Sequence, residues 1–141
     1  RRMKFVDNEL DVNTYLELRA SVHWKVLLEE QAELALKNSL YTLVVYEDGI
    51  AVGMGRIVGD GAVICYVQDL VIRPEYHKRG IGGALLDRLK AYVDALRIPG
   101  SEMMFDLMCA KGREDFYEKH DFIARPTSAL GPGMIQYLKD N

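Results

Sequence analysis

Cysteine is scarce in this sequence, with only two among 141 residues, and both Cys65 and Cys109 stand inside apolar runs. So few thiols cannot provide a disulfide framework, and sparse cysteine is typical of proteins in a reducing cytoplasm. We expect both cysteines to be core residues. No apolar run approaches the ~20 residues that a membrane-spanning helix needs. The opening segment RRMKFVDNEL also lacks the apolar stretch of a signal peptide, so the sequence predicts a cytoplasmic protein with no membrane partner.

The sequence also lacks a surplus of positive charge. Lys and Arg number 18 against 21 Asp and Glu, which gives a net charge of −3. Since a nucleic-acid binder carries a basic surface, the charge argues against that class of partner. Only three histidines are present, and no set of His, Cys and carboxylate residues clusters along the chain, so we expect no metal. The length and a hydrophobic content of 49% predict a single domain over residues 1–141.

Apolar periodicity and turn signals predict an ordered series of helices and strands. Asp48-Gly49 between two apolar runs is a strong hairpin signal, and the nearly apolar run 62–72 is typical of a central strand. In chain order we expect a helix over 11–20 capped by Asp11 or Asn13, a loop over 22–25, a helix over 26–38 with Leu34 near its apolar face and Asn38 at its end, a hairpin over 41–58, a strand over 62–72, a helix starting at Arg79, a strand over 103–110, a short helix over 112–122 and a final strand within 126–138.

This order predicts an α/β protein, with a mixed sheet and helices on both faces. The strand over 62–72, the helix that follows it and the strand over 103–110 should form a right-handed parallel crossover.

The segment between the strand over 62–72 and the next helix combines cations with glycines, in the order His77-Lys78-Arg79-Gly80-Ile81-Gly82-Gly83. The first N–H groups of a helix have no internal acceptor, and the helix dipole is positive there, so such a segment suits an anion. A nucleotide P-loop spacing is absent, and a dinucleotide fingerprint fails because Leu85 stands where its third glycine belongs. The alternative is a plain strand-to-helix turn with solvated cations.

Residues 77–83 resemble the acyl-CoA loop of the GCN5-related N-acetyltransferases (GNAT), usually written Q/R-x-x-G-x-G/A. LVIRPEY at 70–76 resembles that family's central strand and its exit, and FYEKHDF at 116–122 resembles the end of one of its helices. The resemblance covers roughly residues 15–137 and is to small single-domain bacterial members.

The resemblance implies the GNAT acyl-CoA N-acyltransferase fold, a central, mostly antiparallel sheet in which two parallel strands splay apart. Acetyl-CoA would be the cosubstrate. Its pantetheine arm would lie in the splayed cleft against backbone groups of Leu70, Val71 and Ile72. Its pyrophosphate would be held by His77, Lys78, Arg79, Gly80, Ile81, Gly82 and Gly83.

Three positions depart from the family pattern. His77 stands where Gln or Arg is usual, and Ala110 replaces an Asn that contacts the cofactor in many members. Asp121 replaces a Gly at a position where we expect positive φ, which Asp tolerates better than most residues.

Tyr117 matches the family's general acid. A phenol with a pKa of ~10 is protonated at neutral pH and can protonate a thiolate whose parent pKa is ~8.5. The alternative role of Tyr117 is a core aromatic.

For the general base, Gln68 and Asp69 are adjacent on one strand and point to opposite faces unless a bulge intervenes. Gln68 cannot titrate, whereas Asp69 either accepts a proton through water or orients the substrate ammonium. Its alternative role is a buried carboxylate bonded to a backbone N–H.

Four residues are candidates for the acceptor end of the site, Gln68 among them. Arg56 and Asp60 either line the substrate or pair with each other, and Trp24 either forms an aromatic wall for the acceptor or is a packing residue.

We therefore expect an N-acetyltransferase that passes the acetyl group directly to a primary amine of a small molecule in a ternary complex, because an acyl-cysteine intermediate lacks an evident base. The alternatives are a protein lysine or N-terminal acetyltransferase and a non-catalytic acyl-CoA-binding module. A homodimer through the final strand is a further expectation.

Overall fold

The computed structural model describes residues 2–141. Its elements in chain order are β1 (Met3–Asp7), α1 (Val12–Ser21), α2 (Glu29–Lys37), β2 (Tyr41–Glu47), β3 (Ile50–Gly59), β4 (Ile64–Ile72), the 3₁₀-helix η1 (Pro74–Tyr76), α3 (Ile81–Leu96), β5 (Met104–Leu107) and α4 (Glu114–Glu118). The chain divides into two compact units, one ending at Leu107 and the other spanning Met108–Asn141.

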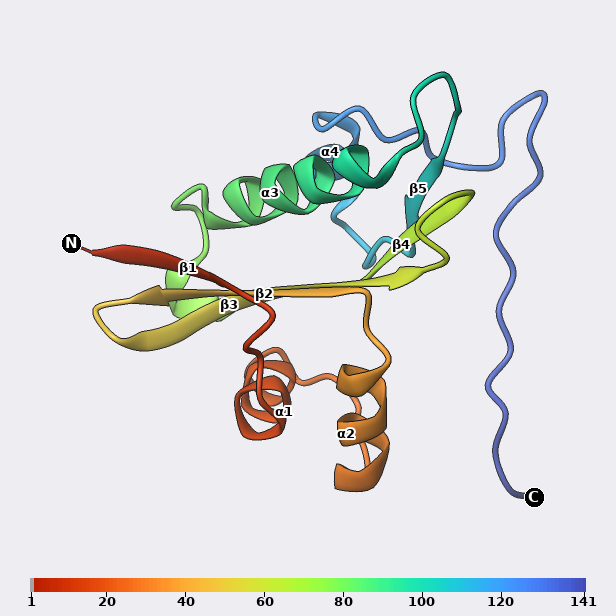
Figure 1. Ribbon diagram of the computed structural model, residues 1–141. Coiled ribbons are helices and arrows are strands. Elements are labelled where there is room, and N and C mark those ends of the chain that lie inside the picture. Colours follow the sequence, from red (N-terminus) through yellow and green to blue (C-terminus); the bar gives the residue numbers. More distant parts are fainter. Residues whose placement is uncertain (1) are drawn as a thin grey trace. The chain divides into compact units, whose positions relative to one another are not determined.

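The first unit is built on one five-stranded sheet in the order β1-β2-β3-β4-β5. The pairs β1–β2, β2–β3 and β3–β4 are antiparallel, and β4–β5 is parallel. Helices α1 and α2 lie on one face of the sheet and α3 lies on the other (Figure 1). The predicted mixed sheet with helices on both faces and a parallel crossover through α3 is therefore confirmed.

Local sequence signals explain several of the element boundaries. Asp48 and Gly49 have φ of 50° and 84°, the left-handed pair that a tight β2–β3 hairpin requires. The side chain of Asp11 accepts a hydrogen bond from Thr14 N–H at 2.8 Å, so Asp11 is the N-cap of α1. Asn38 is the C-cap of α2, as expected.

Apolar side chains cover both faces of the sheet. On the α1 and α2 side, buried Tyr15 and Leu18 pack with Met54 and Val71 of the strands. On the other side, α3 approaches closely over Gly55, where an added Cβ would lie 2.7 Å from Leu89 Cδ1. The small residue on β3 thus sets the distance between α3 and the sheet.

Two strand assignments need correction, one strand that was missed and one that was predicted but is absent. Strand β1 was not predicted, because it is short and partly exposed and depends on pairing with β2 rather than on its own apolar pattern. The final strand expected within 126–138 is wrong, since the described residues after Glu118 contain no helix or strand. A strand forms only against a partner, and no other strand pairs with this segment.

Two burial predictions are also wrong. Cys65 is buried, but Cys109 is exposed because it follows the end of β5 instead of lying within it. Leu34 is exposed, and Ala32 is the buried residue of α2. Across residues 2–141, no helix combines the length and the apolar character that crossing a lipid bilayer requires.

Candidate functional site

The segment joining β4 to α3 presents backbone N–H groups with no acceptor. Lys78 and Gly80 have φ of 63° and 79°, so the chain turns sharply before α3 begins at Ile81. Within the described part of the chain, no protein acceptor bonds to the N–H groups of residues 78–83. Because α3 is 16 residues long, its dipole adds positive potential at the same place. This is the geometry of an anion site at a helix N-terminus.

The side chains of this segment have separate roles. His77 Nε2 lies 2.8 Å from Ile72 O and so donates to the strand it follows, which fixes the start of the loop. Arg79 pairs with Glu47 at 3.1 Å, and its guanidinium lies 4.8 Å from the centre of the Tyr76 ring. Lys78 is exposed and has no partner among residues 2–141. Lys78 is thus the cation available to a ligand, and Arg79 is held in place beside the loop.

Strand β4 has an open edge next to this loop. Its parallel pairing with β5 covers only Ile64 to Val67, so the residues from 68 to 72 face no strand on that side. Arg73 N–H donates to Val52 O of β3. By the alternation of an antiparallel ladder, Val71 also bonds toward β3, whereas the backbone groups of Leu70 and Ile72 point to the open edge.

The three residues expected to contact pantetheine differ in whether their backbone groups point to the open edge of β4. Leu70 and Ile72 have the right orientation, although Ile72 O already accepts from His77. Val71 is a correction, because its backbone groups belong to the β3–β4 ladder and its side chain packs in the core.

A β-bulge decides where Asp69 points. Arg56 pairs with Asp69, but the next residue of β3, Ile57, pairs with Val67, so Gln68 is an extra residue in β4. The bulge places Val67 and Asp69 on opposite faces although they are two positions apart. Asp69 therefore enters the face covered by α1 and α2, and Gln68 is exposed.

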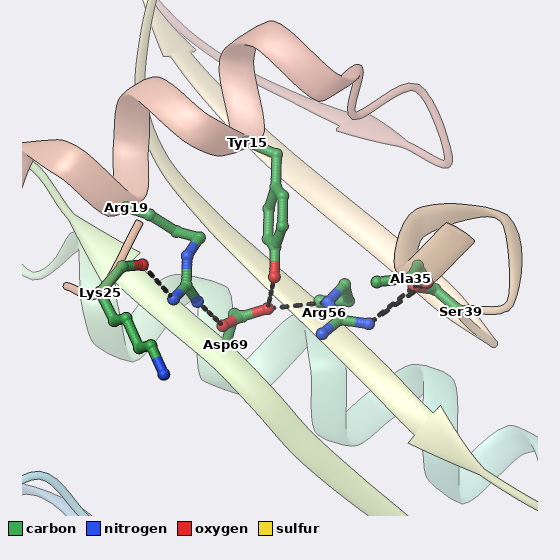
Figure 2. Close-up of polar contacts among 7 residues, drawn as sticks. All are labelled: Tyr15, Arg19, Lys25, Ala35, Ser39, Arg56 and Asp69. Atoms are coloured by element: carbon green, nitrogen blue, oxygen red, sulfur yellow. Dashed lines mark hydrogen bonds and ion pairs between the residues drawn. The ribbon is translucent and has the colours of Figure 1, made fainter. Parts of the chain in front are cut away.

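Asp69 is the centre of a buried polar network (Figure 2). Its Oδ2 accepts from Arg56 Nε at 2.7 Å and from the Tyr15 hydroxyl at 2.8 Å, and its Oδ1 accepts from Arg19 at 3.4 Å. Arg56 also donates to Ser39 Oγ at 3.1 Å, which ties the network to the end of α2. Burial, followed by the charge of Asp69, raises the pKa of Tyr15, so this hydroxyl stays a donor.

Two expectations about these residues are corrected by the network. Asp69 is not placed as a general base, because its side chain is 0% exposed and both its oxygens accept from donors of the protein. Arg56 does not pair with Asp60. The Asp60 carboxylate instead accepts the N–H groups of Ala62, Val63 and Ile64, and these bonds, that of Ile64 first, lower the pKa of Asp60.

Trp24 follows α1 and lies beside the network. The centre of its ring is 5.3 Å from the guanidinium carbon of Arg19, and the ring is partly exposed. Arg19 also donates to Lys25 O at 2.9 Å, so the loop after α1 is fastened to the same side chain. The loop over 22–25 is therefore confirmed, and it carries an aromatic surface next to a cation.

The second unit carries Tyr117 on the short helix α4. Its ring packs edge-on against Phe116 and Phe122, with ring centres 5.0 and 5.8 Å away. Burial, and secondly the neighbouring Cys109, raise the pKa of Tyr117, so the phenol is protonated at neutral pH. Its hydroxyl has no hydrogen-bond partner among the described residues. Asp121 has φ of 70°, which confirms the positive φ expected where the family pattern has Gly.

Sequence reasoning missed Tyr15 and Arg19. Their spacing of four on a helix places them on one face, and an aspartate in an otherwise apolar strand needs buried donors. Both signals are present in the sequence, but neither says which helix face lies over Asp69. No three His, Cys, Asp or Glu side chains converge anywhere in residues 2–141, and the expectation of no metal stays a prediction.

Comparisons with known proteins place this geometry in context. A family model for the acetyltransferase (GNAT) domain matches residues 38–124. A GNAT acetyltransferase family protein of Streptococcus pneumoniae is 25% identical with a TM-score of 0.82, covering 99% of this chain and 100% of its own. A Staphylococcus aureus protein described as a probable acetyltransferase is 24% identical with a TM-score of 0.84, covering 96% and 100%. Glucosamine-6-phosphate N-acetyltransferase of Arabidopsis thaliana shares the fold at 13% identity, with a TM-score of 0.72 and coverage of 99% and 100%. No curated protein sequence gives a match.

Proposed function

Because the chain belongs to the GNAT acetyltransferase family, we propose that it transfers the acetyl group of acetyl-CoA to a primary amine of a small molecule. The observation that carries the proposal is the row of acceptor-free N–H groups at residues 78–83, at the start of α3 and beside the open edge of β4. Both features are those that a pyrophosphate and an amide-containing arm would use.

The residues around the loop fit acetyl-CoA as a cosubstrate. The N–H groups of residues 78–83 would hold the pyrophosphate, and the exposed ammonium of Lys78 would meet an outer phosphate. Leu70 and Ile72 would bond to the pantetheine amides along the open edge. Arg79 contributes its charge from a position fixed by Glu47. When bound, the cosubstrate supplies the activated acetyl group.

Tyr117 is our proposed general acid. Its raised pKa keeps the phenol protonated well above neutral pH, and its hydroxyl has no competing partner in the described chain. It would donate its proton to the sulfur as the thiolate leaves. Cys109 is a poor nucleophile although the residue is exposed, because partial desolvation of its thiol and secondly Glu114 raise its pKa and so disfavour the thiolate. This supports direct transfer in a ternary complex over an acyl-cysteine intermediate.

Asp69 acts in this proposal by holding Arg19 and Arg56 rather than by taking a proton. The amine then loses its proton to solvent. Since an alkyl amine has a pKa near 10.4, only about one molecule in a thousand is neutral at pH 7.4. The rate should therefore rise roughly tenfold per pH unit below the pKa of the amine, provided that Tyr117 stays protonated.

A small acceptor is supported by the compact surface formed by Trp24 and Arg19, which offers one aromatic face and one cation. A fold neighbour, glucosamine-6-phosphate N-acetyltransferase, is named for a small amino-sugar substrate. Cytoplasmic localisation and a homodimer stay predictions, although the described residues contain no final strand to form the dimer contact.

The test is the release of CoA from acetyl-CoA, measured with and without a panel of amines and peptides. Release that depends on small amines supports the proposal. Release that depends only on peptides would indicate a protein acetyltransferase. CoA binding without release in any condition would indicate a non-catalytic module.

A further inference from the structure

Arg19 is the incompletely bonded member of the buried network. A guanidinium has five N–H donors, and in Arg19 only two of them have acceptors among residues 2–141, Asp69 Oδ1 at 3.4 Å and Lys25 O at 2.9 Å. Its Nε is buried and has no partner among the described residues. A buried donor without an acceptor is costly, so Arg19 is under-bonded, and a ligand would reach its guanidinium through the 12% of the side chain that is exposed.

The charges of the network also favour a further acceptor at Arg19. Two guanidinium cations, of Arg19 and Arg56, face one carboxylate, that of Asp69, and their side chains are 12%, 8% and 0% exposed. Arg56 takes the short contact of 2.7 Å to Asp69, with Ser39 Oγ and Ala35 O as further acceptors, whereas Arg19 lies 3.4 Å from the carboxylate (Figure 2). The surplus positive charge therefore resides on Arg19, the more exposed of the two cations.

We propose that Arg19 binds a carboxylate of the acceptor amine, so that the substrates of the proposed acetyltransferase are amino acids or related amino carboxylates. This inference rests on the proposed function. A single carboxylate balances the surplus charge of the network, whereas a phosphate dianion would exceed it. A planar carboxylate also matches the planar fork of a guanidinium.

The location of Arg19 suits the acceptor. Asp69, which holds it, directly precedes Leu70, whose backbone groups point to the open edge of β4. Trp24, with its ring centre 5.3 Å from the guanidinium, provides an apolar wall for the carbon chain between the carboxylate and the amine. The network thus fixes one end of the acceptor and leaves its amine free.

The test uses matched pairs of amines that differ only in the carboxylate, such as 3-aminopropanoate with 3-aminopropanamide and an α-amino acid with its amide. Trp24 is the only tryptophan of the chain, so its fluorescence reports binding beside Arg19 without any substitution. Titrations are performed with CoA-saturated protein. At least one carboxylate should bind about 10- to 100-fold more tightly than its amide, the range of one charge-assisted contact. The variant Arg19→Gln should reduce this preference to about twofold or less.

Arg97→Gln is the matched control, because it removes the same charge from an arginine that pairs only at the surface with Asp94 and with Ser101 O. It should keep the full preference. If Arg19→Gln does not fold, Arg19→Lys retains the cation but loses the planar fork, and its preference should still fall. Equal affinity for both members of every pair in the wild type, or an unchanged preference in a folded Arg19 variant, would overturn the inference. Carboxylate binding without acetylation would instead refute the proposed function alone.

Discussion

Replacement of Asp69 by Asn should destabilise the protein more than any other isosteric change in the first unit. Asp69 is fully buried and is the anion that pairs with both Arg19 and Arg56 in the described network. Removing one partner of a buried ion pair costs about 3–5 kcal/mol. Because the Asn carbonyl can still accept one hydrogen bond and Arg19 retains some solvent contact, we expect about 3 kcal/mol. For 141 residues the unfolding entropy is about 0.3 kcal/mol/K, so Tm should fall by about 10 °C.

Asp106→Asn is the control, because Oδ1 of Asp106 is buried without any donor among the described residues, and burial raises the pKa of this carboxyl. Its neutralisation should leave Tm unchanged or higher at pH 7. A raised pKa means that the folded state binds the proton more tightly than the unfolded state. The wild type should therefore gain stability relative to Asp106→Asn as the pH falls from 7 through the raised pKa. Thermal unfolding of all three proteins measures both effects, and equal Tm values for Asp69→Asn and Asp106→Asn would refute the reasoning about the network.

Three further predictions concern activity. Tyr117→Phe keeps the ring and its packing, so Tm should change little while single-turnover transfer falls about 10²–10⁴-fold; wild-type chemistry in a folded variant would show that solvent protonates the thiolate. Lys78→Ala should weaken CoA binding about 10-fold at low salt and less at high salt. Calorimetry at two salt concentrations is the test, and a loss of affinity that does not depend on salt would contradict a charge contact between Lys78 and a phosphate. Trp24→Ala should raise KM for the acceptor more than KM for acetyl-CoA, whereas an equal rise in both would indicate a role in folding.

The elements that carry strong local signals were predictable from the sequence. The Asp48-Gly49 turn, the Asp11 cap and the strand-loop-helix unit around Gly80 each depend on residues close in the chain, and the structure has all three. Strand β1 was missed because its partner β2 lies about 40 residues away. The final strand was overpredicted for the converse reason, since an apolar segment becomes a strand only when another strand pairs with it.

The candidate site likewise contains residues that the local sequence identifies and residues whose roles depend on tertiary structure. Residues 77–83 were identified from their order alone, because the helix start and the glycines are local features. The position of Asp69 was not predictable, since it depends on a bulge at Gln68 that changes which face of the sheet the side chain enters. Once that face is known, the spacing of Tyr15 and Arg19 on α1 explains the network, but no local pattern brings α1 over β4.

The central claim is that the backbone at residues 78–83 binds the pyrophosphate of CoA, and calorimetric titration with CoA tests it most directly. The wild type should bind CoA, and Gly82→Val should lose at least about 10- to 100-fold in affinity, because a branched side chain keeps the phosphates from the N–H groups. Gly131→Val is the matched control, since an added Cβ there meets open space, and it should bind as the wild type does. Equal CoA affinity in folded Gly82→Val and the wild type would contradict the claim.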